Sequence, residues 1–210
     1  MDIGTLLVTY GFLFLGELGD KTQLIVFNLA LEYKKFYKLG IGITLGFALL
    51  VSIGVFFGAI ITRFFPLFLI SLISGIIFLV IGLLEARTLR KLYLQKNSKQ
   101  ENNNTDKNLE NESILSSKYS KLKNNPYLAG FVYIFLMELG DKTQLLTISL
   151  AAISPPVEVW LGSFLALISV AWIGIFLGAI IARKVPKFYL KLISTLIFII
   201  VGVLIIVTLF

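Results

Sequence analysis

Apolar residues run in six long stretches along the chain, and polar residues gather between them. The stretches cover residues 3–31, 39–62, 66–85, 127–153, 157–182 and 187–209. Each is long enough to cross a hydrocarbon core of about 30 Å, which takes about 20 helical residues. None alternates between apolar and polar positions as a half-buried strand does. The pattern therefore predicts six transmembrane helices in an all-α integral membrane protein.

The polar segment between the third and fourth stretches has a different composition from the rest. Residues 86–125 are rich in Lys, Asn, Ser and Glu and nearly free of aromatic residues. Such a segment cannot bury enough apolar surface to offset the entropy lost on folding, so we expect a disordered linker. It divides the chain into residues 1–85 and 126–210, each with three predicted spans.

The two halves repeat each other in sequence. Residues 17–24, Glu-Leu-Gly-Asp-Lys-Thr-Gln-Leu, return unchanged at 138–145, and residues 58–61 return at 178–181. Because each half has an odd number of spans, the second half must enter the membrane with opposite polarity, as in transporters built from inverted repeats. We therefore expect two inverted three-helix repeats, with the two octapeptides meeting near the centre of the bilayer.

The amino-acid composition excludes several classes of function. Hydrophobic residues make up 57% of the chain and charged residues 15%, which is typical of a multi-pass membrane protein. Cysteine and histidine are both absent, so disulfides, thiolate nucleophiles, imidazole bases and the usual zinc or copper ligands are excluded. We expect neither an enzyme nor a resident cofactor.

The net charge of +7 indicates the orientation of the chain in the membrane rather than nucleic-acid binding. All but three of the 19 basic residues fall in loops on one side of the predicted spans; the exceptions are Lys21, Arg63 and Lys142. Basic loops face the cytoplasm. We therefore expect the linker in the cytoplasm, both termini on the opposite side, and a location in the plasma or inner membrane or another energised membrane.

Each octapeptide places ionisable residues in the middle of an apolar stretch, where acids and bases are costly and usually functional. On a continuous helix, positions three, four and eleven residues after the first glutamate share its face. In the two copies that face carries Glu17, Asp20, Lys21 and Asn28, and Glu138, Asp141, Lys142 and Ser149. Gly19 and Gly140 also permit a break that exposes backbone carbonyls. Oxygen ligands of this kind favour a hard cation such as Mn²⁺, Ca²⁺ or Mg²⁺.

The sequence Glu-x-Gly-Asp-Lys-Thr, present once in each half, resembles the signature of the Gdt family of manganese and calcium transporters. That signature has a hydrophobic residue after Glu, Lys or Arg after Asp, and Ser or Thr at the end, and both copies fit at every position. The resemblance implies divalent-cation transport against protons, with the metal held by Glu17, Asp20, Glu138 and Asp141. We expect supporting roles for the other motif positions, namely Thr22, Gln23, Thr143 and Gln144.

These observations predict a secondary transporter that exports Mn²⁺, Ca²⁺ or both from the cytoplasm in exchange for protons, without choosing between the two ions. A passive cation channel remains open as an alternative, as does a structural or regulatory membrane protein whose charged motifs only lock helices together. The expected partners are lipid, the divalent ion and protons, with no nucleic acid. The sequence leaves a homo-oligomer open.

Overall fold

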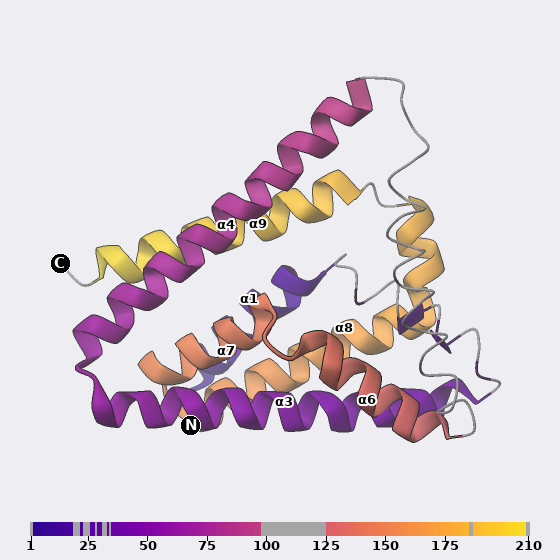
Figure 1. Cartoon of the computed structure of the whole chain (residues 1–210), viewed down its shortest axis with the longest axis horizontal. Coiled ribbons are helices and arrows are strands. Elements are labelled where there is room, and N and C mark those ends of the chain that lie inside the picture. Colours follow the sequence, from indigo (N-terminus) through magenta and orange to yellow (C-terminus); the bar gives the residue numbers. More distant parts are fainter. Residues whose placement is uncertain are drawn as a thin grey trace.

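The computed structural model describes residues 2–18, 22, 26–27, 29–30, 33, 35–97, 125–184 and 187–208. Within these residues every regular element is a helix, and Figure 1 shows them as α1 (Ile3–Glu17), α3 (Phe36–Phe64), α4 (Leu67–Asn97), α6 (Pro126–Glu138), α7 (Lys142–Ile153), α8 (Pro156–Lys184) and α9 (Lys187–Val207). The all-α prediction is confirmed for this part of the chain. In the same part, three segments are long and apolar enough to cross a membrane alone: Phe36–Phe64, Leu67–Arg87 and Pro156–Leu177.

Prolines mark the starts of three helices. α4 begins directly after Pro66, and α8 begins at Pro156. α6 has Pro126 at its first position, behind the N-cap Asn125, whose side-chain oxygen accepts hydrogen bonds from two backbone N–H groups of the first turn. Proline fits the first turn of a helix because the N–H it lacks has no intrahelical partner there. The proline positions therefore predict these three boundaries.

Two of the predicted helices differ from the apolar pattern. The stretch 127–153 is divided into α6 and α7, and α1 ends at Glu17 although its apolar stretch continues to residue 31. At the division Gly140 has a φ of +84°, which glycine adopts without steric cost. A continuous helix through the octapeptide is therefore wrong for the second copy, whereas the break that Gly140 permits is confirmed. Residues 19–21 of the first copy lie outside the described residues.

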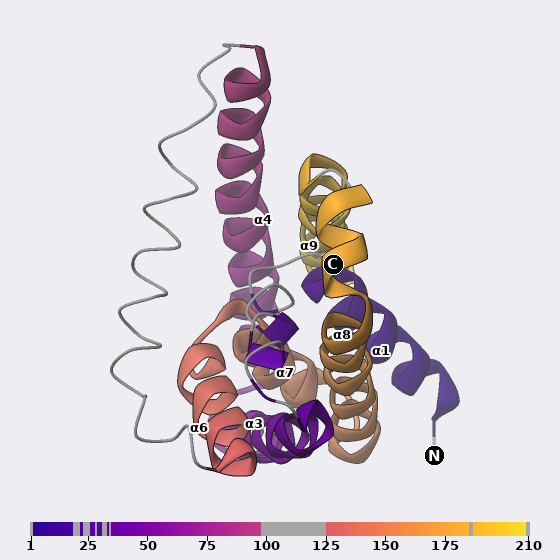
Figure 2. The same cartoon turned by 90° about the vertical axis from the view of Figure 1, so that its right-hand side faces the viewer.

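The two halves of the chain are interleaved. The third helix of each half packs along that of the other, α4 along α9, as Figures 1 and 2 show. α1 packs against α8 of the second half, and α6 packs against α3 of the first. α3 also contacts α7 and α8. Each described helix makes its most extensive contacts with a helix of the other half, so residues from both octapeptides are brought to one place.

Glycines bring the interleaved helices into backbone contact. A Cβ on Gly42 of α3 would lie 2.0 Å from the carbonyl oxygen of Tyr127 in α6. A Cβ on Gly162 of α8 would lie 2.7 Å from the carbonyl oxygen of Leu6 in α1. Close approach through small residues is a common way for membrane helices to associate. These two contacts hold α6 against α3 and α1 against α8. α1 and α6 are the helices that end at the first residue of an octapeptide.

The predicted boundary of the linker needs a correction. α4 continues as a helix through residue 85 to Asn97, so the beginning of the expected disordered segment is helical. Figure 2 shows α4 standing clear of the other helices at this end. Residues 98–124, the rest of the predicted linker, lie outside the described residues.

Candidate cation site

Three carboxylates from both halves of the chain gather at one point. Glu17, Glu138 and Asp141 each offer a carboxylate oxygen, and the three oxygens lie within 4.8 Å of one another. Two oxygens on opposite sides of a Ca²⁺ ion lie about 4.6–5.2 Å apart, because Ca²⁺–oxygen distances are about 2.3–2.6 Å. The three oxygens are therefore close enough to contact one ion.

Two of these carboxylates are buried. Glu17 is 3% exposed and Glu138 is 4% exposed, whereas Asp141 is exposed. A buried carboxylate is stable only if hydrogen bonds or opposite charge compensate it. The site thus has a closed side, formed by the two glutamates, and an open side at Asp141.

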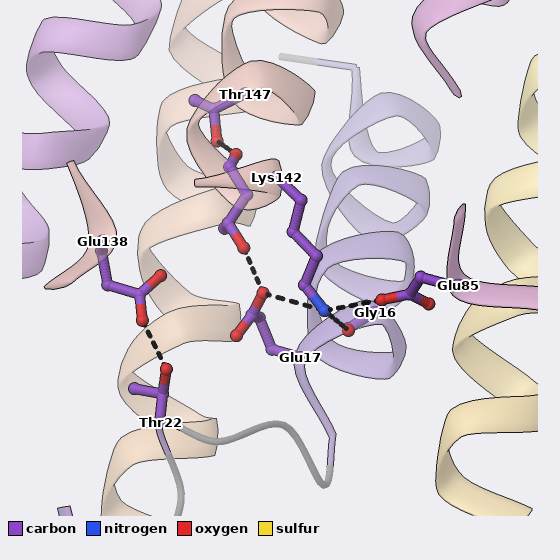
Figure 3. Close-up of polar contacts among 8 residues, drawn as sticks. Gly16, Glu17, Thr22, Glu85, Glu138, Lys142 and Thr147 are labelled. Atoms are coloured by element: carbon purple, nitrogen blue, oxygen red, sulfur yellow. Dashed lines mark hydrogen bonds and ion pairs between the residues drawn. The ribbon is translucent and has the colours of Figure 1, made fainter. Parts of the chain in front are cut away.

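The threonine of each octapeptide bonds the glutamate of the other. The Thr22 hydroxyl donates to Glu138 Oε1 at 2.5 Å, and the Thr143 hydroxyl donates to Glu17 Oε1. Figure 3 shows Thr22 below Glu138 and Glu17 beside the lysine of the second octapeptide. Each hydroxyl fixes the direction of the carboxylate it bonds, so the two halves position each other's acidic group.

The local backbone explains how Asp141 joins the group. It occupies the N-cap position of α7, yet its side chain makes no capping hydrogen bond there. Instead Gln144 Oε1 accepts a hydrogen bond from the Gly140 N–H at 2.6 Å, which stabilises the turn before α7. The run from Gly140 to Gln144 therefore ends one helix and begins the next, and the Asp141 carboxylate is directed at the cluster.

Helix ends add to the electrostatics of the site. α1 ends at Glu17 and α6 ends at Glu138, so the C-terminal carbonyls of both helices lie near the carboxylates. The C-terminal end of a helix carries partial negative charge, which stabilises cations. α7 starts at Lys142, and its N-terminal end partly offsets the negative charge. Broken helices with their ends at a site are typical of membrane transporters.

Lys142 supplies a positive charge at the edge of the cluster. Its Nζ donates to the Gly16 carbonyl oxygen at 3.1 Å and to Glu85 Oε1 at 3.2 Å, and lies 3.9 Å from Glu17 Oε1 (Figure 3). The sequence analysis missed Glu85, which lies at the end of the third apolar stretch and is 8% exposed. An ionisable residue inside a predicted span was the available signal.

A small cavity lies beside Glu138. Its volume is about 10 Å³, and its polar lining consists of Glu138, Thr143, Gln144 and Thr147. That is about the space of one water-sized group. Apolar side chains from α3 and α8 complete the wall, among them Phe47 of α3. Of the three clustered carboxylates, Glu138 alone lines this cavity.

The structure brings some of the predicted site residues to the cluster and places another elsewhere. Of the second octapeptide, Glu138, Asp141, Lys142, Thr143 and Gln144 are all at the site. Ser149 instead lines a larger cavity of about 220 Å³ with residues of α3 and α4. Its predicted alignment with Glu138 assumed a continuous helix. The remaining predicted residues, Asp20, Lys21, Gln23 and Asn28, lie outside the described residues.

Fold and site together define an α-helical membrane protein with a buried cluster of oxygen ligands suited to a hard cation. The chain matches the family model described as divalent cation/proton antiporter GDT1 over residues 5–91 and 126–210. The chain therefore belongs to the GDT1 family, and the resemblance seen in the octapeptides is confirmed. Membership makes it a membrane transporter of divalent cations.

Two curated relatives agree with this assignment. The chain is 30% identical over 203 residues to the GDT1-like protein sll0615 of Synechocystis sp., covering 93% of this chain and 90% of that protein. It is 23% identical over 222 residues to the GDT1-like protein C186.05c of Schizosaccharomyces pombe, covering 90% of this chain and 84% of the relative. No solved structure gives a significant match.

Proposed function

We propose that the protein exports Mn²⁺, Ca²⁺ or both from the cytoplasm in exchange for protons. In this proposal the ion is held by Glu17, Asp20, Glu138 and Asp141 near the middle of the bilayer. The observation that carries it is the approach of three of these carboxylates, from both halves of the chain, to within 4.8 Å of one another. The family description, a divalent cation/proton antiporter, supports the exchange of a divalent cation for protons.

The proposed architecture is six spans in two inverted three-helix repeats. The reciprocal bonds of Thr22 to Glu138 and of Thr143 to Glu17 support it, because a two-fold relation between the halves produces such pairs. α6 and α7, with 13 and 12 residues, are each too short to cross alone and together form one broken span in this proposal. The location is an energised membrane, with the linker in the cytoplasm.

Charge arithmetic explains the exchange. The two octapeptides carry four carboxylates and two lysines, a formal net charge of −2, and Glu85 beside Lys142 brings the cluster to −3. When a divalent ion leaves, two protons replace its charge, and a site that keeps a small net charge crosses a low-dielectric membrane at far lower cost than one with two further negative charges. Alternating access of such a site gives exchange of one divalent ion for about two protons.

The test uses purified protein in liposomes with the membrane voltage clamped. An imposed pH gradient is expected to drive Mn²⁺ or Ca²⁺ to accumulate on the acidic side, and collapse of the gradient with a proton ionophore should stop it. Liposomes without protein provide the background. Cation flux that ignores the gradient would indicate a passive channel, and no flux of any divalent ion would refute the transport proposal.

A further inference from the structure

The ammonium group of Lys142 is shared between the cation cluster and α4. Lysine has three N–H donors and no acceptor. Two hydrogen bonds go to the Gly16 carbonyl at 3.1 Å and to Glu85 Oε1 at 3.2 Å, while Glu17 Oε1 forms a longer ion pair at 3.9 Å, beyond hydrogen-bond distance. The Phe198 ring lies on the same side, with its centroid 5.8 Å from Nζ. The ammonium is therefore held toward α4 and α9, at the edge of the cluster.

This position matters because the ammonium and a divalent cation compete for Glu17. Glu17 Oε1 is the oxygen that lies 3.9 Å from Lys142 Nζ, and it also accepts the hydrogen bond of the Thr143 hydroxyl. An ammonium that moved onto the Glu17 carboxylate would occupy a ligand of the site, and it would repel an incoming ion of charge +2. Glu85 offers the ammonium another carboxylate, on α4.

The carboxylate of Glu85 has no counterpart at the equivalent position of the second half of the sequence. The repeat relates Gly82 to Gly202, so the position equivalent to Glu85 is Ile205. The threonine–glutamate bonds are reciprocal between the halves, but the carboxylate that contacts Lys142 has an apolar residue as its counterpart. Glu85 is therefore not a member of the duplicated motif, and its role has to be argued from its own contacts.

We propose that Glu85 is a positioning residue that sets the affinity of the cation site by holding the Lys142 ammonium off Glu17. This inference rests on the proposed function, because it concerns the same site. Glu85 itself does not contact the ion in this mechanism; it acts through Lys142. Loss of its charge turns the ammonium into an internal competitor of the divalent cation.

The first experiment measures Mn²⁺ and Ca²⁺ binding to the purified full chain and transport by the same protein in liposomes. Glu85→Gln is expected to raise the Kd and the KM for the cation about tenfold or more, since a charge-assisted hydrogen bond is lost, with kcat near that of the original protein. Glu85→Asp keeps the charge and should recover most of the affinity. Unchanged Kd and KM in Glu85→Gln would overturn the inference.

Glu158→Gln is the matched control. Glu158 lies in the first turn of α8, is 8% exposed like Glu85, and accepts a hydrogen bond from the Asp2 backbone N–H. Glu158→Gln is the same chemical change at a position away from Lys142, so the cation Kd of this variant should equal that of the original protein. An equal rise in Kd in both variants would assign the effect to general loss of a buried charge and contradict the inference.

A double substitution separates competition from a structural tie between α7 and α4. Glu85→Gln with Lys142→Met removes both charges, so cation binding should be tighter than in Glu85→Gln alone. If Glu85 only ties the helices together, the double variant binds no better than the single one, and the inference fails. Should Glu85→Gln elute as aggregate in size-exclusion chromatography, Glu85→Asp decides instead: its shorter side chain should raise the cation Kd by less than about tenfold, and a Kd equal to that of the original protein would overturn the inference. Absence of cation binding by the original protein would refute the proposed function itself.

Discussion

The Thr143 hydroxyl of α7 donates a hydrogen bond to the Glu17 carboxylate of α1, 126 positions earlier in the chain. The equivalent residue of the first octapeptide, Thr22, donates to Glu138 at 2.5 Å. Each acidic group is thus oriented by a hydroxyl from the other half. The cluster of Glu17, Glu138 and Asp141 therefore depends on residues of both octapeptides.

Single loss of either glutamate should disable transport. Glu17→Gln and Glu138→Gln each remove a charged ligand from a buried cluster, a change that costs about 3–5 kcal/mol when the remaining charges stay buried. We expect the initial rate of Mn²⁺ or Ca²⁺ uptake by proteoliposomes to fall roughly a hundredfold or more in each variant.

The double variant tests whether the two glutamates serve one site. With a shared site, Glu17→Gln combined with Glu138→Gln is no slower than either single variant, since the site is already lost. Partial losses that add strictly in free energy would instead indicate two independent sites and contradict the shared cluster.

The reciprocal hydroxyls give a more graded prediction. Thr143→Val keeps the shape of the side chain but removes the donor to Glu17, and a hydrogen bond to a charged group contributes about 1.5–3 kcal/mol. The cation Kd should therefore rise about tenfold or more, while Thr143→Ser should stay close to the original value. Titration with Mn²⁺ and Ca²⁺ in detergent measures both.

Thr44→Val is the control for this substitution. Thr44 is partly buried in α3, and its hydroxyl donates to the Gly40 backbone carbonyl at 2.9 Å rather than to a carboxylate. Loss of this hydroxyl should leave the cation Kd within about twofold, because such back-bonds contribute little to a helix. If Thr143→Val and Thr44→Val weaken binding equally, orientation of Glu17 is not the cause.

Most of the fold could be predicted from the sequence because length, apolar character and proline determine where long spans lie. α3, α4, α8 and α9 start within a few residues of the predicted stretches. The division between α6 and α7 could not be located by hydropathy, since apolar residues continue on both sides of it. Gly140 was a local signal, and it allows a break without requiring one.

The site was predictable only in part, for a related reason. Sequence spacing identifies neighbours on one helix, and the carboxylates of the duplicated motif were found in this way. The contact of Glu85 with Lys142 spans 57 positions, and the second half has Ile205 at the position equivalent to Glu85, so neither periodicity nor the repeat indicates the contact. Ser149 shows the converse error: the helix that would align it with Glu138 is interrupted at Gly140.

Orientation can be tested with single cysteines, because the chain has none of its own. A cysteine at Ser98, in the predicted linker, and one at Ser154, between α7 and α8, should react with a membrane-impermeant maleimide from opposite sides of the membrane. Leu13→Cys, at a fully buried position of α1, should react from neither side. Labelling of Ser98 and Ser154 variants from the same side of intact cells would contradict the inverted repeat.

The turn at Gly140 offers a test of how the backbone positions the site. Within the described residues, positive φ occurs at Gly140 alone, and a Cβ added there would meet nothing within 4 Å. Any cost of substitution is therefore conformational, about 1–3 kcal/mol for a residue that disfavours this region. Gly140→Ala should shift the start of α7, move the Asp141 carboxylate from the cluster and raise the cation KM.

Gly140→Asn should raise the KM less than Gly140→Ala, because asparagine adopts positive φ more readily than alanine. Gly11→Ala serves as the control: a Cβ at Gly11 also meets nothing within 4 Å, but this glycine lies inside α1, where alanine is favourable. Its KM should be unchanged, with a thermal midpoint equal or higher. If alanine and asparagine at position 140 raise the KM equally, the added side chain rather than the backbone is responsible, and the turn does not position Asp141.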